Sequence, residues 1–425
     1  MVGPFRVLFL PSVVDAKFTA PVVLFAVKIS SWPKEWDVEL VGQDFYDQSF
    51  GHANFHRVRS RSRGQIPVLL LLRRMKVVLL TALISVGLGQ RQKFDVVYLR
   101  HGSNSPVGVF LRWLWQIPVV AEVHGLAASE VEIKGWLRGA STGGRRVLSW
   151  AFRSFEKWAF SKAHTIISPT GALRDFLVHT YGLSSEKIVV VPNGVDSRLF
   201  QPEARSPVTE PYKGEFDYIC FEGNLSPYQG LDTLFDAFAV VKRRFPRGRL
   251  LLVGDGVEAG RLKERAEELG LVKDICFVGS VLQDQIPALV NLSKVCVTSY
   301  QGERHELTGA SPLKLFEYMA CAKPVVSTDI KGVRELLEES HAGVLVPEGD
   351  SSAMAEGITR LLADERLQAE LGHNGREYVL RHHDWSDISR RLADIVSSAG
   401  GRTHAARVDS GTPPSTPGSH GERTR

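Results

Sequence analysis

The sequence predicts an α/β protein in which two doubly wound parallel sheets face each other across a cleft. One reason is length: 425 residues are too many for one compact core and correspond to two or three domains at ~150 residues each. The other is pattern, because short β-branched runs alternate with amphipathic segments, as in repeated strand–helix–strand units. With 44% apolar and 23% charged residues, the composition excludes a fibrous or wholly disordered chain.

The first half of the chain supplies the strands of one sheet. Residues 7–10 form an apolar run after a single basic residue, Arg6, and no small-residue cleavage site follows, which favours a first strand over a signal peptide. Further apolar runs are typical of parallel strands that are buried on both faces. They lie at residues 94–99, 117–123, 163–168 and 187–191.

A Pro- and Glu-rich stretch at residues 201–211 marks the predicted domain boundary and hinge. Helix patterns follow it, one with Leu231, Leu234, Phe235 and Phe238 on one face and one at residues 258–269 that ends at Gly270. We expect domains at residues 1–200 and 201–377, with a helix at about residues 378–396 that packs back on the first domain. The second domain has strand candidates at residues 217–222, 249–253, 274–278, 294–298, 323–328 and 343–346.

Charge and cysteine content describe the chain further. Residues 1–200 contain 25 Lys and Arg against 14 Asp and Glu, a net of +11, whereas residues 201–425 contain 27 against 33, a net of −6. The four cysteines are far apart and form no CxxC pair, so neither a disulfide framework nor a zinc site is predicted, and a reducing cytoplasm is expected. The tail, residues 400–425, is rich in Gly, Pro, Ser, Thr and Arg and is expected to be disordered.

Residues 57–76 have the most unusual composition, with seven basic side chains and no acid, and a mostly apolar stretch continues to residue 88. Arg73, Arg74 and Lys76 interrupt the apolar run, which excludes a membrane-spanning helix of ~20 apolar residues. Two interpretations stay open: a helix lying on an anionic membrane surface, or an ordinary helix buried on the first sheet behind a basic loop. Nucleic-acid binding is not favoured, because the basic run lacks interleaved aromatic residues.

Residues 311–328, SPLKLFEYMACAKPVVST, carry the clearest chemical signal. Ser311 suits an N-cap and Pro312 the first helical position, so a helix is predicted to run through Met319. Free N–H groups at such a helix start bind phosphate, and Lys314 in the first turn opposes the helix dipole unless an anion lies nearby. Glu317 lies on the same face, where a carboxylate suits a ribose diol. An exposed Lys314–Glu317 ion pair is the plainer alternative.

Glycines and a histidine after predicted strands favour the ligand interpretation. Gly223 and Asn224 follow residues 217–222, with Gln229 shortly after them, and Gly254 follows the next strand. Glycines at strand ends let a ligand approach the backbone. His124 follows residues 117–123, at a carboxyl end of a strand, where doubly wound sheets bind ligands.

In their order and spacing, these motifs resemble those of the retaining glycosyltransferases of family 4, which have the GT-B fold of two Rossmann-like domains. The resemblance extends from the first strand to about residue 390. It rests on the segments IISPTGALRDFL, KIVVVPNGVDSRLF, GNLSPYQGLDTLFDAF, LLLVGDG, ICFVGSV, SPLKLFEYMACAKPVVSTDIKGVRELL and GVLVPEGD.

The resemblance implies that the second domain binds a nucleotide diphospho-sugar and that the first binds the acceptor. Glu317 matches the glutamate that binds the nucleotide ribose, and His124 matches the histidine that reaches the donor sugar or its phosphate. His124, Lys314 and Glu317 are the predicted catalytic residues, and neither a cofactor nor a metal is expected. The predicted donor-binding residues are Gly223, Asn224, Gln229, Gly254, Glu317 and the diphosphate-contacting loop of Thr308, Gly309, Ala310 and Ser311.

This chain departs from the family pattern in three ways. The pattern has Arg at the place of Asn224 and Lys at the place of Gln229, both of which help to neutralise the leaving diphosphate. It also has a second glutamate, separated from the ribose-binding one by seven residues, where this chain has Gly309, and a glycine pair after the first strand that is missing here. Similar variants occur in a branch of the family that acts in surface-polysaccharide assembly, so Lys314, with Arg304 or His305, is expected to supply the missing cations.

The predicted function is transfer of a sugar, with retention, from a UDP-linked donor to a lipid-linked or glycan acceptor in surface-polysaccharide assembly. The expected location is cytoplasmic and peripheral on the inner face of the cell membrane, with residues 57–88 against an anionic surface. Three alternatives stay open: transfer to a soluble small molecule, a UDP-sugar 2-epimerase-like isomerase, and a catalytically degenerate binding scaffold, the last motivated by Asn224, Gln229 and Gly309.

Overall fold

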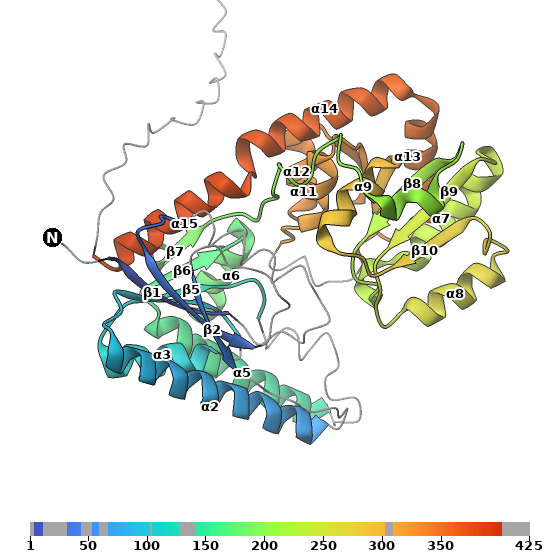
Figure 1. Ribbon diagram of the computed structural model, residues 1–425. Coiled ribbons are helices and arrows are strands. Elements are labelled where there is room, and N and C mark those ends of the chain that lie inside the picture. The colour runs from blue at the N-terminus through green and yellow to red at the C-terminus, as the bar shows by residue number, and fades with distance from the viewer. Residues whose placement is uncertain are drawn as a thin grey trace, which may run out of the picture.

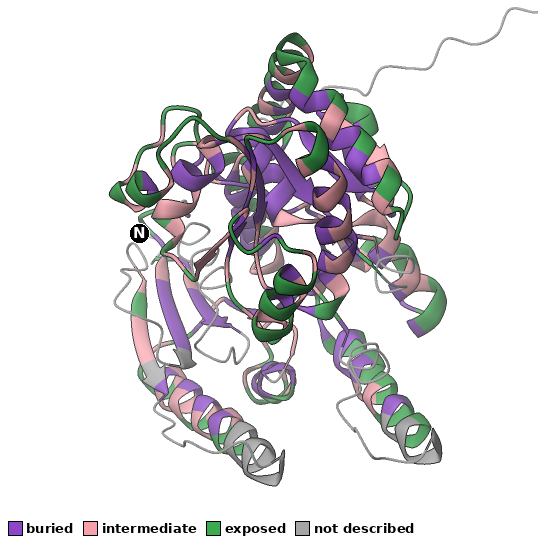
Figure 2. Ribbon diagram, turned by 90° about the vertical axis from the view of Figure 1, so that its right-hand side faces the viewer, coloured by how far each residue is buried: buried purple, intermediate pink, exposed green. Residues whose placement is uncertain are grey.

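The computed structural model describes residues 4–11, 32–43, 53–58, 67–102, 104–126, 142–301 and 309–401. These residues form two α/β domains, each built around an all-parallel sheet (Figure 1). Buried residues run along the strands, and exposed residues lie on the outer faces of the helices (Figure 2). The predicted fold class is confirmed. The predicted disorder of the tail concerns residues that, beyond Gly401, lie outside the described part of the chain.

The N-terminal sheet has the strand order β3-β2-β1-β4-β5-β6-β7. β1 lies at its centre, with Val7 opposite Val38 of β2 on one side and opposite Val96 of β4 on the other. The strands predicted in this half form β1 and β4 to β7. The bounds are β1 (Arg6–Leu10), β2 (Asp37–Gln43), β3 (Asn54–Val58), β4 (Val96–Arg100), β5 (Val119–Glu122), β6 (Thr165–Ser168) and β7 (Ile188–Val190).

The sequence reasoning missed β2 and β3, because both strands contain polar residues, one of which, Glu39, the sheet buries. Glu39 of β2 is buried and accepts hydrogen bonds from Asn54 Nδ2 of β3 (3.2 Å) and from Gln92 Nε2 (3.0 Å). A buried polar group is tolerated when it has such partners. A near alternation of apolar and polar residues over 37–43 was the available signal for β2.

Helices cover both faces of the N-terminal sheet. One face and its helices share an apolar core that contains Val77, Leu111, Phe160 and Leu173. The other face is covered by α15 (Trp385–Ala399), which buries Trp385, Leu392 and Val396 against β1 and β4 although it follows the second domain in sequence. The helices of the first face are α2 (Pro67–Arg91), α3 (Ser105–Trp115), α5 (Thr142–Lys162) and α6 (Gly171–Tyr181).

Residues 67–91 form α2, which buries some of its apolar side chains and exposes others. Its described portion packs Val77 and Leu88 into the core below the sheet, while Met75, Leu79 and Leu83 are 59–60% exposed. Residues 59–66 and the side chains of Arg57 and residues 67–74 lie outside the described part of the structure. Among the helices described, none is long and apolar enough to cross a membrane.

The C-terminal sheet has the strand order β10-β9-β8-β11-β12-β13, so β8 lies near its centre, with Ile219 opposite Leu250 of β9 and Val295 of β11. Each of these strands matches a run predicted from the sequence, to within a residue or two at its ends. The bounds are β8 (Asp217–Glu222), β9 (Gly248–Val253), β10 (Ile275–Gly279), β11 (Ser293–Thr298), β12 (Val325–Thr328) and β13 (Gly343–Val346).

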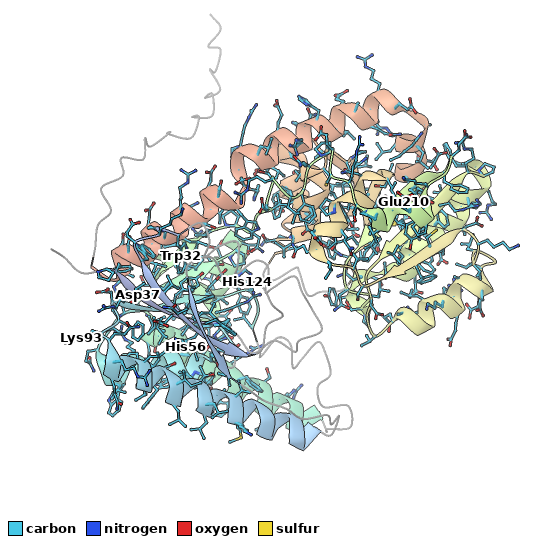
Figure 3. All side chains as sticks on the ribbon, in the orientation of Figure 1. Trp32, Asp37, His56, Lys93, His124 and Glu210 are labelled. Carbon is cyan, nitrogen blue, oxygen red and sulfur yellow. The ribbon has the colours of Figure 1, made fainter. Side chains whose placement is uncertain are left out.

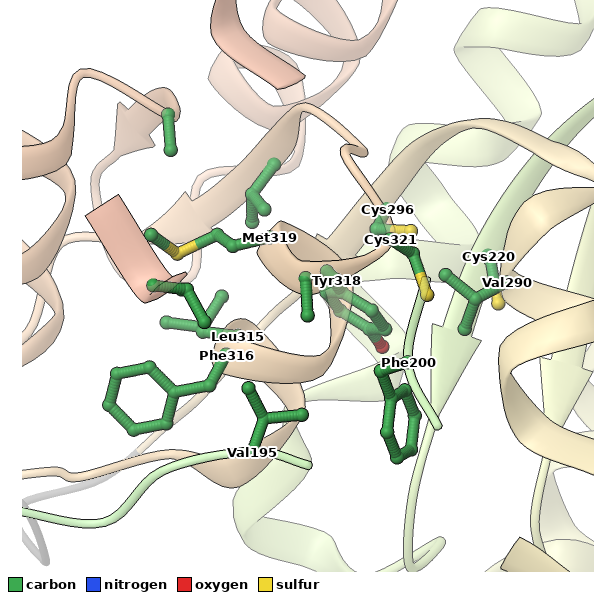
Figure 4. Packing of buried hydrophobic residues seen from close by; sticks show 14 of the residues in the cluster. Val195, Phe200, Cys220, Val290, Cys296, Leu315, Phe316, Tyr318, Met319 and Cys321 are labelled. Atoms are coloured by element: carbon green, nitrogen blue, oxygen red, sulfur yellow. The ribbon is translucent and has the colours of Figure 1, made fainter. Parts of the chain in front are cut away.

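The helices of this domain also form two layers. α7 (Leu231–Arg244) and α13 (Ser351–Ala363) share one core with the sheet, and the predicted Leu231, Leu234, Phe235 and Phe238 are its buried face. On the other face, α11 (Leu313–Ala320) packs Tyr318 and Met319 among Cys220, Cys296 and Cys321 (Figure 4). The remaining helices of this domain are α8 (Ala259–Glu268), α9 (Ile286–Asn291), α12 (Val333–Ser340), α14 (Glu365–His382) and the short 3₁₀ turns η2 (Pro207–Tyr212), η3 (Pro227–Gln229) and η4 (Gln283–Gln285). A further 3₁₀ turn, η1 (Ser185–Lys187), precedes β7 in the N-terminal domain.

Two chain segments that connect the domains run side by side. Val195 N–H donates to His383 O (2.9 Å), and Trp385 N–H donates to Val195 O (3.0 Å). Gly194 allows this approach, because a Cβ there would lie 2.3 Å from His383 O. The described structure therefore has a two-stranded crossover of residues 193–197 and 383–385, just before the Pro- and Glu-rich stretch that was predicted as the hinge.

Candidate functional site

Close backbone approach shapes the carboxyl ends of β8 and β9. Gly223, directly after β8, has φ +133°, and a Cβ there would lie 2.8 Å from Lys314 Nζ. Gly254, directly after β9, has φ +127°, and a Cβ there would lie 2.0 Å from Gly223 O. Only glycine fits both constraints. The two glycines predicted at the donor site therefore lie next to each other and admit Lys314.

Lys314 is buried at the start of α11. Its Nζ donates a hydrogen bond to Gln229 Oε1 (2.8 Å) and lies over the rings of Phe221 (4.3 Å) and Tyr300 (5.5 Å). Burial lowers the pKa of Lys314 to about 8, although Glu222 and Glu317 act in the opposite direction. The ammonium therefore stays charged at neutral pH but is poorly solvated, which favours an anionic ligand next to it.

Glu317 and Glu222 form a pair of carboxyl groups beside this lysine. Burial raises the pKa of both, and for Glu317 the nearby Glu222 raises it further by its charge and a hydrogen bond. The Glu222 N–H donates to Tyr318 Oη (2.8 Å), which ties β8 to α11. The carboxyl oxygens can accept hydrogen bonds from hydroxyl groups, and the ammonium beside them can donate to a phosphate. This arrangement excludes the exposed Lys314–Glu317 ion pair.

Glu222 is the residue that sequence reasoning missed. It was assigned only to a strand, DYICFE, whose other interior residues are apolar. The available signal was a carboxylate at the carboxyl end of a buried strand, directly before a glycine, which is where doubly wound sheets bind ligands. Its pairing with Glu317, 95 positions later in the chain, follows from the packing of α11 on β8.

The start of α11 differs in detail from the prediction. The helix begins at Leu313 with Pro312 at the N-cap position, and no side chain caps it, so the expected Ser311 cap is wrong. Ser311 instead contacts the crossover: its carbonyl accepts from Asn193 Nδ2 (3.0 Å) and its hydroxyl from the Asn193 N–H (3.4 Å). The cap was expected because serine is a common N-cap residue. Here the oxygens of Ser311 accept hydrogen bonds from Asn193 of the crossover instead.

Two of the predicted diphosphate-binding residues contact other parts of the protein and do not form a free loop. The Ala310 N–H donates to Lys331 O (2.8 Å), so this amide is already used within the protein. Gly309 has φ +67° and faces the other domain, because a Cβ there would lie 3.3 Å from Ala172 Cβ and 3.6 Å from Thr170 Oγ1. Thr308, Arg304 and His305 lie outside the described residues. The N-terminal turn of α11 thus lies at the boundary of the two domains.

The remaining donor-site candidates surround the same strand ends. Gln229, at the end of η3, is buried, and its carbonyl accepts from Ser299 Oγ (2.7 Å). Asn224 is half-buried, and its side chain lies beside Gly256, where a Cβ would be 2.6 Å from Asn224 Oδ1. Gln229 thus joins the Lys314 cluster, whereas Asn224 lies beside it on the loop after β8.

His124 lies in the N-terminal domain, two residues after β5. It is half-buried, and its Nε2 is 2.5 Å from Glu122 Oε1, while Tyr98 Oη donates to Glu122 Oε2 (2.5 Å). Figure 3 shows His124 on the side of this domain that faces the C-terminal domain. A carboxylate on one ring nitrogen orients the imidazole. Within the described residues, no group of three or more His, Cys, Asp or Glu side chains could hold a metal ion.

Comparisons with known proteins identify relatives of both domains. A family model described as Glycosyltransferase Family 4 matches residues 32–199, and one described as Glycosyl transferases group 1 matches residues 205–378. A GDP-mannose-dependent alpha-(1-6)-phosphatidylinositol monomannoside mannosyltransferase of Mycobacterium tuberculosis (strain ATCC 25618 / H37Rv) is 29% identical over 213 residues. That match covers 48% of this chain and 54% of the relative, so the chain spans about half the length of the relative.

Solved structures show the same fold. A sucrose-phosphate synthase from Thermosynechococcus elongatus superposes with a TM-score of 0.75 at 21% identity, covering 92% of this chain and 98% of the other. Anabaena Alr3699/HepE, solved in complex with UDP, superposes with a TM-score of 0.67 at 20% identity, covering 93% and 100%. At these identities the structural matches establish the shared two-domain fold.

Proposed function

Because the chain belongs to glycosyltransferase family 4 and has its GT-B fold, we propose that it transfers a sugar, with retention, from a UDP-linked donor to a lipid-linked acceptor in surface-polysaccharide assembly. The observation that carries the donor half is the cluster of Lys314, Glu317 and Glu222 against Gly223 at the carboxyl ends of the C-terminal strands. In this proposal Glu317 binds the ribose, and Lys314 with the first turn of α11 binds the diphosphate.

The position of Lys314 accounts for the departure at Gln229. The family pattern that the sequence resembles has a lysine where this chain has Gln229, and Lys314 Nζ reaches Gln229 Oε1 from another element. A cation is thus supplied at the same place. Leaving-group charge is stabilised most by donors that are already in position when it develops, so Lys314 would act on the departing β-phosphate without a metal ion.

His124 and the crossover complete the proposed mechanism. His124, oriented by Glu122, would contact the donor sugar or its phosphate from the N-terminal domain. The acceptor hydroxyl would attack on the face from which the nucleotide departs, and the leaving phosphate would take its proton. Domain closure about the crossover would exclude water that otherwise hydrolyses the donor.

The acceptor half of the proposal has two supports. The mycobacterial relative is named for a phosphatidylinositol mannoside acceptor, which is a lipid. In this chain, α2 presents Met75, Leu79 and Leu83 to solvent at a spacing of four residues, and such an exposed apolar stripe is what a helix needs in order to lie on a membrane. The proposed location is therefore peripheral on the cytoplasmic face of the cell membrane.

The test of the donor site is UDP binding by isothermal titration calorimetry. Glu317→Ala should weaken binding ~10–100-fold, because a charged hydrogen-bond acceptor contributes ~1.5–3 kcal/mol. Glu264→Ala, at an exposed position of α8, is the matched control and should bind UDP as the wild type does. Failure of the wild type to bind UDP, or equal binding by Glu317→Ala, would refute the assignment, and the second result would favour a degenerate scaffold.

Turnover then separates the remaining alternatives. With a UDP-sugar and a polyprenyl-diphosphate glycan, nuclear magnetic resonance of the product should show the anomeric configuration of the donor. Transfer to a soluble sugar and not to the lipid-linked glycan would replace the acceptor assignment while leaving the donor site in place. Conversion of the UDP-sugar to its 2-epimer without transfer would identify an isomerase instead.

A further inference from the structure

Exposed apolar side chains are concentrated on one side of the N-terminal domain. Among the described residues, nine of the fourteen exposed large hydrophobic side chains belong to α2, α3 and α5, and α3 contacts both of the other helices. These helices form an outer layer at the bottom of the view in Figure 1. A concentration of exposed apolar side chains on a protein surface indicates an interaction site. The nine are Met75, Leu79, Leu83, Phe110, Trp113, Leu114, Val147, Trp150 and Trp158.

A groove of about 480 Å³ lies between α3 and α5 within this surface. Trp113 and Trp158, which are 69% and 47% exposed, contribute aromatic walls from the two helices. Phe110 extends the α3 wall, with its ring centroid 6.2 Å from that of Trp113. Arg112 and Lys162 line the same groove. The groove therefore combines exposed aromatic rings with cations.

A third cation, Lys187, is close to the other two. Lys187 Nζ donates to Ser161 O (2.8 Å) at the end of α5, and the pKa of Lys187 is lowered first by burial and then by the charges of Arg112 and Lys162. Within the described part of the chain, none of the three forms an ion pair. The three positive charges repel one another. A bound anion would stabilise them by offsetting this repulsion.

The composition of the three helices agrees with an anionic partner. Their sequences contain ten Lys and Arg and a single acid, Glu156. Glu156 is buried and accepts from Tyr181 Oη (2.7 Å), so it adds no negative charge to the surface. Tryptophan and basic residues together are typical of protein surfaces at the boundary of lipid headgroups and acyl chains.

We propose that the α3–α5 groove docks on an anionic phospholipid bilayer, with Trp113 and Trp158 in the headgroup boundary and Arg112, Lys162 and Lys187 around a lipid phosphate. This inference rests on the proposed function for its lipid-linked acceptor. It moves the centre of membrane contact from residues 57–88 to a face shared by α2, α3 and α5.

The groove is separate from the donor site. Arg112 and Lys162 lie in the last turns of α3 and α5, and Lys187 is the last residue of η1, directly before β7, so all three lie at the amino ends of strands. The donor cluster and His124 lie at the carboxyl ends of theirs. Substitutions in the groove should therefore leave UDP binding unchanged.

The test is flotation of the full-length protein with two kinds of vesicle, one of phosphatidylcholine and one of phosphatidylcholine and phosphatidylglycerol in equal parts. The wild type should float with the anionic vesicles only. Lys162→Glu should weaken this binding ~30-fold, because each cation near the surface contributes ~1 kcal/mol and the substitution reverses one. Trp113→Ser should weaken it roughly tenfold by removing an aromatic anchor.

Matched controls lie on the other domain. Lys273→Glu changes charge equally, Val257→Ser removes an apolar side chain that is 83% exposed, and both should float as the wild type does. Equal flotation of all variants, or no flotation of the wild type, would overturn the proposal. So would a change from dimer to monomer in Trp113→Ser without loss of flotation, which would assign the groove to a second copy. UDP titration of the same proteins reports separately on the donor site.

Discussion

At the scale of single residues, the proposed donor site depends on burial more than on residue type. Lys314 is buried near two aromatic rings and two carboxyl groups. Burial removes water from all three charged groups, which lowers the pKa of Lys314 and raises that of Glu317. A negatively charged ligand would offset the hydration that the Lys314 ammonium has lost on burial.

The charge of Lys314 should therefore be visible in the pH dependence of UDP binding. Since the pKa of Lys314 is about 8, wild-type affinity should be full just below that pH and should decline as the pH rises through it, because the ammonium loses its proton. Lys314→Met should bind UDP ~10–100-fold more weakly at neutral pH and show no such decline. Calorimetric titrations of both proteins across this range are the measurement. The same decline in Lys314→Met would assign it to another group.

At the scale of elements, α11 connects the proposed donor site to the crossover between the domains. Ser311, two residues before the helix begins, contacts Asn193, and the Phe316 ring of α11 stacks on His383 at 4.2 Å. His383 Nδ1 is in turn 2.9 Å from Asn193 O. The PNGVD sequence at residues 192–196 thus connects the crossover to the start of α11.

Substitution of Gly194 tests this connection. Gly194→Ala should lower stability by ~1–3 kcal/mol, because the new Cβ would lie 2.3 Å from His383 O and 2.6 Å from Ile388 Cδ1. Gly87→Ala has open space around the Cβ within α2 and should raise stability by about 0.5–1 kcal/mol. Urea unfolding of both variants measures the difference. A neutral Gly194→Ala would mean that the crossover relaxes freely.

At the scale of the whole molecule, a helix from the C-terminal part of the chain packs against the N-terminal domain. α15 follows the C-terminal domain yet supplies the helical layer on one face of the N-terminal sheet, where Leu392 and Val396 share a core with Val7 and Tyr98. The N-terminal domain therefore depends on residues nearly 400 positions away.

Removal of one buried side chain from α15 should reveal this dependence. Leu392→Ala should destabilise the protein by ~2–5 kcal/mol, because it leaves a cavity in a close-packed core. Arg391→Ala, at the adjacent exposed position, should stay within ~0.5 kcal/mol of the wild type. Hydrogen exchange should locate the loss of protection in β1 and β4. Loss confined to the C-terminal domain would contradict the assignment of α15.

Periodicity was sufficient for most of the fold. Apolar runs such as those of β4, β9 and β12 are typical of strands that are buried on both faces, so their pattern predicts a parallel sheet. β2 and β3 were not predicted, because a buried glutamate such as Glu39 needs hydrogen-bond partners. These partners, Asn54 and Gln92, come from other segments of the chain. The candidate site residues that belong to recognisable sequence motifs were predicted, whereas Glu222 was not.

The sequence by itself determined two parallel-sheet domains, because local apolar patterns encode their strands without reference to distant residues. It also predicts the boundary between them and the strand ends at which we propose that a ligand binds. Only the tertiary structure decided that Lys314 reaches Gln229, that Glu222 pairs with Glu317, that α15 covers the first domain, and that a cationic groove opens between α3 and α5. The physical reason is that each of these features is a contact between segments far apart in the chain, whose energy depends on burial and distance rather than on residue type.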